Sequence, residues 1–172
     1  IDGNGQKAVI MNASQTSTSL YGFIITGGKG VNVSCSAGEA IIQHCIFKNN
    51  TNDGNGDAIL TSDSMNSFLK ILDCEFSFNY GMAIHLQSTN NETNSNQEQV
   101  NIQNVLIHNQ ESSSGDIIHI GPNIDASVNS LTTANNTTNG HTFYHKNNDA
   151  TTTIKNSIFW NFSNTELSWY DN

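Results

Sequence analysis

The sequence has no arginine, only three cysteines and only 12% charged residues, and each shortage excludes a class of protein. Its formal net charge is −9, because 15 acidic residues face six basic ones, so the chain repels phosphate backbones and anionic lipid surfaces. We therefore expect no nucleic-acid partner. No apolar run approaches the roughly 18 residues of a membrane helix, so we also expect no membrane insertion. Three cysteines are too few for a disulfide framework.

The chain length of 172 residues fits one domain, which we assign to residues 1–172. Asn, Ser, Thr and Gly dominate its polar half, a composition typical of disorder only where apolar residues are scattered. Here the apolar residues recur in a fixed frame. Because patterned sequence reaches both ends, we expect the chain to be a segment of a larger protein.

One frame recurs six times along the chain. The stretch IIQHCIFKNN at 41–50 is repeated by KILDCEFSFN at 70–79, with an apolar residue, a reference residue, a second apolar residue and an Asn at equal offsets. The reference positions are separated by 22, 29, 31, 26 and 26 residues and are Phe23, Cys45, Cys74, Val105, Leu131 and Ser157. Repeats of this length with short insertions are typical of solenoid proteins.

A second frame lies between the copies of the first. In it a glycine turn precedes a short strand of period two, as in GDAILT at 56–61 and GMAIHL at 81–86. The first inward residue of each such strand is predicted to be Val31, Ile59, Ile84, Ile118 and Phe143. Two or more short strands per repeat, with no helical pattern, predict an all-β solenoid of parallel strands with about six coils.

Equivalent residues of a solenoid lie above one another at the strand spacing of about 4.8 Å. We therefore predict one internal column of Ile25, Phe47, Phe76 and Ile107. Cys45 is predicted to lie over Cys74. Stacked inward side chains run parallel, which leaves their Cβ atoms farther apart than a relaxed disulfide prefers, so we predict two buried free thiols.

Two further columns are predicted at corners of the solenoid. The residue that ends each unit is expected to adopt the left-handed backbone that Gly and Asn tolerate best; these residues are Gly28, Asn50, Asn79 and Asn136. A second column is expected to form a side-chain hydrogen-bond ladder; it contains His44, Asp73, Asn104, Ser130 and Asn156.

At this level the chain resembles right-handed parallel β-helix repeat proteins of bacterial cell surfaces. LYGFIITGG, the paired GEAI…CIFKNN and GDAI…CEFSFN, and IKNSIFWNFSNTEL are similar to the GGAI/FxxN repeats of polymorphic outer-membrane proteins and to secreted β-helix proteins of Bacteroidetes type. The resemblance spans essentially the whole chain and implies a right-handed coil. It implies little about activity, because the same coil carries adhesins, autotransporter passengers and polysaccharide lyases.

A binding strip is predicted on the outer face of the second-frame strands. His85 and His119 follow equivalent inward residues, and Tyr144 is next in the same column. Two imidazoles about 5 Å apart can bind a transition metal, and a His/Tyr strip can stack on a sugar ring. The alternative is a pair of solvated histidines on a sheet face.

Acidic residues give two weaker candidates. Asp53, Asn55 and Asp57 alternate in NDGNGD like the first half of a calcium loop, although Ser64 stands where a closing acid belongs, and a plain glycine-rich turn is the alternative. Asp57 and Asp116 share the position after the frame glycine, and two coil steps would place them roughly 9–10 Å apart, near the wide end of the range for the carboxylate pair of an inverting hydrolase. Because Met82 lies between them and no acidic cluster forms, we expect both to face water. No cofactor is otherwise implied.

The six lysines occupy different offsets, which disfavours a lyase that holds an acidic polysaccharide with basic side chains. The leading prediction is therefore a non-catalytic extracellular or cell-surface module that acts as an adhesin, stalk or interaction surface and binds a glycan or a surface protein. The alternative is a polysaccharide-degrading enzyme, a glycoside hydrolase or lyase, whose site lies on the strand face or outside this segment.

Overall fold

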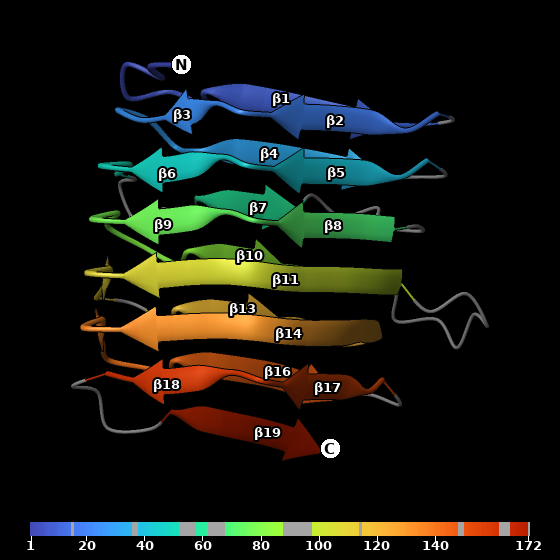
Figure 1. Cartoon of the computed structure of the whole chain (residues 1–172), viewed down its shortest axis with the longest axis vertical. Coiled ribbons are helices and arrows are strands. Elements are labelled where there is room, and N and C mark those ends of the chain that lie inside the picture. Colours follow the sequence, from blue (N-terminus) through green and yellow to red (C-terminus); the bar gives the residue numbers. More distant parts are fainter. Residues whose placement is uncertain are drawn as a thin grey trace.

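The computed structural model describes residues 1–14, 16–35, 38–51, 58–61, 68–87, 98–113, 115–147, 150–161 and 166–171. These residues form parallel strands and no helix, and the chain winds as a right-handed solenoid of about 5 turns (Figure 1). Within the same ranges, no helix has the length and apolar character needed to cross a membrane. The predicted fold class is confirmed.

The first sheet is formed by the second-frame strands, which lie at the back of Figure 1. Its strands pair in the order β1 (Val9–Ala13), β4 (Val31–Cys35), β7 (Ile59–Thr61), β10 (Ile84–Leu86), β13 (Ile118–Ile120), β16 (Phe143–Asn147) and β19 (Leu167–Asp171). Every neighbour is parallel, and each comes from the next turn of the chain. This is the arrangement that a regular repeat of strand and turn requires.

The second sheet lies in front and is formed by the first-frame strands. Its first half contains β2 (Thr18–Tyr21), β5 (Ala40–Gln43), β8 (Phe68–Leu72), β11 (Glu98–His108), β14 (Ile124–Ala134) and β17 (Thr152–Lys155). After a bend it continues as β3 (Ile24–Ile25), β6 (Ile46–Lys48), β9 (Glu75–Ser77) and β18 (Ile158–Trp160), while β11 and β14 run through both halves. A short pair, β12 (Glu111–Ser112) and β15 (Thr137–Thr138), closes a third side.

The predicted number of coils needs a correction, because the chain makes about 5 turns and not six. The six copies of the frame are correctly aligned, since the strands of the second sheet pair at the predicted positions. The prediction counted copies of the first frame, and the six copies are separated by five full turns.

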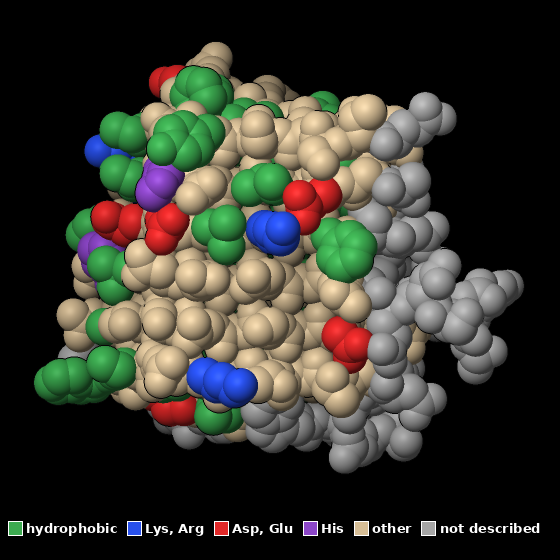
Figure 2. Space-filling view, turned by 45° about the vertical axis from the view of Figure 1, so that its right-hand side comes forward, with side chains coloured by type: hydrophobic (Ala, Val, Ile, Leu, Met, Phe, Trp, Pro, Cys, Tyr) green, Lys and Arg blue, Asp and Glu red, His purple; other side chains and the backbone are tan. Residues whose placement is uncertain are grey.

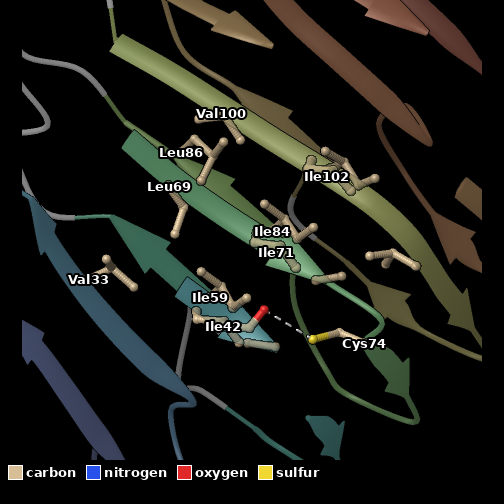
Figure 3. Packing of buried hydrophobic residues seen from close by; sticks show 14 of the residues in the cluster. Val33, Ile42, Ile59, Leu69, Ile71, Cys74, Ile84, Leu86, Val100 and Ile102 are labelled. Carbon is tan, nitrogen blue, oxygen red and sulfur yellow. Dashed lines mark hydrogen bonds between the residues drawn. The ribbon is translucent and has the colours of Figure 1, made fainter. Parts of the chain in front are cut away.

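The core is a set of stacked columns between the two sheets. The rings of Phe47 and Phe76 lie 4.7 Å apart and nearly parallel at 5°, with Ile25 and Ile107 above and below them, as predicted. All five predicted inward residues of the first sheet are fully buried, and they align with one another. Figure 3 shows Ile59 and Ile84 pointing toward Ile42, Ile71 and Ile102 of the facing sheet.

Cys45 and Cys74 are buried free thiols, as predicted, and Cys35 is also buried and outside any disulfide. Each predicted thiol points at a backbone oxygen of the coil before it: Cys45 Sγ lies 3.5 Å from Leu20 O, and Cys74 Sγ lies 3.6 Å from Ile42 O (Figure 3). The hydrogen bond that Cys74 makes with Cys45, together with burial, raises the pKa of Cys74.

The two corner columns were predicted with unequal success. The predicted side-chain ladder is present in part, because Asn104 Nδ2 donates to Asp73 Oδ1 at 2.8 Å and His44 Nε2 lies 3.8 Å from Asp73 Oδ2. These residues also take the left-handed backbone, which was predicted for the other column and not for this one; φ is 53° at His44 and Asp73 and 52° at Asn104. The other corner turns one residue earlier than predicted, at Gly27, Asn49, Phe78, Asn109 and Asn135. At each of these corners except the first, the side chain of the next residue points into the core; Asn50 is an example.

These inward residues form a buried amide ladder. Each residue of the ladder except the last donates its backbone N–H to the side-chain oxygen of the equivalent residue in the next coil, over 2.7–3.0 Å. The order of the residues is Asn50, Asn79, Gln110, Asn136 and Asn161. The side-chain amides of Asn50, Asn79 and Asn136 also donate to backbone oxygens of the preceding coil. The ladder therefore satisfies backbone groups that the bend would otherwise leave buried without partners.

Candidate functional site

The predicted strip on the first sheet is assembled by the structure. His85, His119 and Tyr144 align on β10, β13 and β16. The His85 and His119 rings meet edge to face at 5.1 Å, and the His119 and Tyr144 rings lie 4.9 Å apart, tilted by 30°. His85 is only 8% exposed, so it is not the solvated side chain that a bare sheet face would present. The amide of Gln87 lies 3.0 Å from His85 Nε2.

A buried carboxylate extends this strip into a cluster. Asp116 lies in the turn before β13 and is 8% exposed, so the expectation that it faces water was wrong. Its Oδ2 lies 2.9 Å from His119 Nδ1, and its Oδ1 lies 2.9 Å from His141 Nδ1 and accepts the His141 backbone N–H at 2.8 Å. We call Asp116, His119, His141, His85 and Tyr144 the His–Asp cluster.

Hydrogen bonding keeps Asp116 ionised. Burial opposes the charge, but bonds from His119 and from the backbone and side chain of His141 outweigh burial and lower the pKa of Asp116 below its usual range. Each imidazole donates from Nδ1 to this carboxylate, so in its neutral form it keeps Nε2 as a lone-pair acceptor. The cluster thus contains two imidazoles whose tautomer is fixed by one carboxylate.

This arrangement can transfer protons through the two Nε2 atoms, and a carboxylate behind an imidazole is also the usual outer partner of a metal-bound histidine. However, in the ranges that the structure describes, no three His, Cys, Asp or Glu side chains are placed to hold one metal ion. The other predicted metal residues, Asp53, Asn55 and Asp57, lie outside the described residues.

The outer face of the second sheet carries a groove that sequence reasoning missed. It has a volume of about 530 Å³ and crosses β8, β11, β14 and β17 near their first residues. Its walls are formed by the outward side chains of these strands and of the residue before β5; they are Glu39, Phe68, Lys70, Gln99, Asn101, Asp125, Ser127, Thr151 and Thr153. Figure 2 shows this face, on which charged side chains are few and most of the surface is backbone and uncharged polar side chains, drawn in tan.

Consecutive strands place these groove residues in two rows along the solenoid axis. One row follows the aligned residues Phe68, Gln99 and Asp125, with Thr151 donating to Asp125 Oδ1 from its backbone N at 2.6 Å and its hydroxyl at 3.0 Å. The other row contains Lys70, Asn101, Ser127 and Thr153, which also align. The groove therefore runs across the strands and parallel to the solenoid axis.

The signals for both missed features were present in the repeat. Asp116 and His141 share one frame position, three residues before His119 and Tyr144, so stacking alone places acid and imidazole on neighbouring coils. The groove residues alternate with the inward residues Leu69, Val100 and Ala126 and could have been grouped by the same alignment. A hollow in a surface, by contrast, depends on side-chain packing that a repeat frame does not specify.

No protein-family profile, curated protein or solved structure matches this chain.

Proposed function

We propose that this chain is a non-catalytic, extracellular or cell-surface β-solenoid module that binds carbohydrate through the groove of the second sheet. The observation that carries the proposal is Phe68, an aromatic side chain that is 48% exposed at the wall of a groove lined with amides and hydroxyls. An exposed ring can stack on the apolar face of a sugar, and amides and hydroxyls can both donate to and accept from sugar hydroxyls.

Two features of the molecule support this use. The groove is built on β-strands whose positions are fixed by the parallel ladder, so its side chains are held in place before a ligand arrives. The similarity of the repeats to those of bacterial cell-surface β-helix proteins favours a location where glycans are the abundant ligands. A rod with few charges and a continuous core is also suited to conditions outside the cell.

The direct test is binding to a glycan array, followed by titration calorimetry on the best ligand. Phe68→Ala should weaken binding about five- to thirtyfold, because a stacked ring contributes roughly 1–2 kcal/mol. Trp160→Ala is the matched control, since Trp160 is 73% exposed at the far end of β18, on the other half of the same sheet. Loss of binding in Trp160→Ala but not in Phe68→Ala would move the site away from the groove and overturn the proposal.

The second candidate function, a polysaccharide-degrading enzyme, is favoured by one observation. Asp116 orients His119 and His141 as a general base is oriented in many enzymes. Glycoside hydrolysis usually needs two carboxylates, whereas the described part of the cluster contributes only Asp116. A reducing-sugar assay on the array ligands separates the two functions, because the binding module should release no product, and an enzyme would lose its product in His119→Ala.

A further inference from the structure

We infer that the groove is selective for a neutral, hydroxyl-rich glycan chain that lies along the solenoid axis, and that it discriminates against uronic-acid polymers. This inference rests on the proposed function and specifies its ligand class. It follows from the charges of the groove, from its hydrogen-bonding groups and from its direction.

The charges of the groove favour a neutral ligand. Lys70 is its only basic side chain among the described lining residues, and Lys70 Nζ lies 2.6 Å from Glu39 Oε1. That ion pair leaves little positive charge to attract a carboxylate or sulfate. Asp125 adds a negative charge that forms no ion pair within the described ranges, and the sequence contains no arginine, the residue best suited to hold anionic groups in two-point contacts. A uronate polymer would therefore meet net repulsion.

The hydrogen-bonding groups of the groove match hydroxyl groups. Gln99 and Asn101 offer both amide donors and carbonyl acceptors, and Ser127 and Thr153 offer hydroxyls that act in either direction. Both hydrogen bonds from Thr151 go to Asp125 Oδ1, and none of the described residues donates to Oδ2. This oxygen is therefore available to a sugar hydroxyl, which a carboxylate acceptor binds strongly.

The direction of the groove favours an extended chain. It spans four strand steps from β5 to β17, or about 19 Å at the normal strand spacing. A bound peptide is disfavoured along the groove, because β8, β11 and β14 are hydrogen-bonded to a strand on each side; among the described residues, the unpaired edge of these four strands is that of β17, at the end of the groove. Phe68 is also the one aromatic anchor among the described lining residues, too few for a peptide groove.

The test compares oligosaccharides of one length by titration calorimetry with the unmodified chain. Cellohexaose, laminarihexaose, xylohexaose and mannohexaose are the neutral probes, and hexagalacturonate and hexaguluronate are the anionic ones. We expect at least one neutral probe to bind about tenfold more tightly than either anionic probe, with little dependence on salt. Asp125→Asn should raise the affinity for hexagalacturonate several-fold, because it removes a repelling charge, while Phe68→Ala should weaken the neutral ligand.

The outcomes distinguish this inference from the proposed function. If an anionic probe binds as tightly as the neutral ones and Phe68→Ala weakens it, the neutral class is wrong and the carbohydrate-binding function stands. If no probe and no array glycan binds, the proposed function is wrong and this inference fails with it. Binding of a neutral probe that Phe68→Ala leaves unchanged, while Trp160→Ala abolishes it, would also overturn the inference, because the ligand would lie elsewhere.

Discussion

The His–Asp cluster and the groove lie on the two opposite sheets, and their polar side chains differ in how fully the protein itself satisfies their hydrogen-bonding groups. In the cluster, the carboxylate of Asp116 is buried and accepts three hydrogen bonds from His119 and His141. In the groove, the carboxylate of Asp125 accepts hydrogen bonds from Thr151 and from no other residue that the structure describes, and it remains partly exposed. One acid is used within the protein, and the other remains available to a ligand.

The difference arises from which residues occupy neighbouring coils. Stacking fixes the neighbour of each side chain at the strand spacing, so a column satisfies itself where an acid lies beside an imidazole, as Asp116 does beside His141. In the groove the neighbours are amides and hydroxyls, whose many donors and acceptors exceed what one neighbour can use. A column rich in such groups thus leaves hydrogen-bonding capacity at the surface.

The largest effect is expected from breaking the cluster. Asp116→Ala leaves two partly buried imidazoles without their acceptor and should lower the free energy of unfolding by about 2–4 kcal/mol at pH 7. Urea denaturation measures this loss. Asp125→Ala is the control and should cost less than about 1 kcal/mol, because its carboxylate is partly solvated. Equal losses in the two variants would show that the contrast between the acids is not energetic.

The second prediction concerns pH. The pKa of Asp116 is lowered in the folded state, so its contribution to stability is fully present above the unfolded value of about 4 and is lost as pH falls through the lower folded value. The free energy of unfolding should therefore decrease below about pH 4. Denaturation between pH 2.5 and 6, a range set around that unfolded pKa of about 4, should give a weaker decrease for Asp116→Asn, and an unchanged slope would contradict the assignment.

The third prediction is a gain in stability and concerns the amide ladder, where polar side chains hydrogen-bond to one another as they do in the cluster. Gln110 is the exception: its Nε2 is buried and has no hydrogen-bond partner in the described part of the chain. Gln110→Asn would restore the residue that the ladder uses at Asn79 and should stabilise the fold by about 1 kcal/mol. The midpoint of urea denaturation should rise, whereas Asn79→Gln, the reverse change, should lower it.

The smallest effect is expected for the groove. Phe68 is 48% exposed, so Phe68→Ala should change the free energy of unfolding by no more than about 1 kcal/mol while it reduces glycan binding. Asp116→Ala should leave glycan binding unchanged. The two variants together therefore test whether the first sheet stabilises the fold while the second sheet binds the glycan. A loss of several kcal/mol in Phe68→Ala would show that the groove is part of the core.

Sequence reasoning predicted the features that repeat. The stack of Phe47 on Phe76 follows from equal offsets in successive frames, because a solenoid places equal offsets above one another. The alignment of His85 with His119 and Tyr144 follows for the same reason. These placements depend on the period alone, so a single sequence is sufficient to predict them.

It failed where the outcome depends on one backbone dihedral angle or on lateral contacts. The left-handed residues are Asn49 and Phe78 and not the neighbouring Asn50 and Asn79, a shift of one position that an asparagine pair such as Asn49-Asn50 leaves ambiguous. The contact of Asp116 with His141 lies within one column, and the repeat could have indicated it. The contact with His119 joins two different columns, and the column pattern alone contains no information about such contacts.

The sequence by itself determined the solenoid and the inward columns, because a repeat of apolar residues at fixed offsets can bury its side chains only by stacking successive turns. The tertiary structure alone decided which polar columns are satisfied internally and which remain open to a ligand. The physical reason is that burial and hydrogen bonding between columns depend on how far each side chain reaches sideways, a quantity that the period of the repeat does not fix.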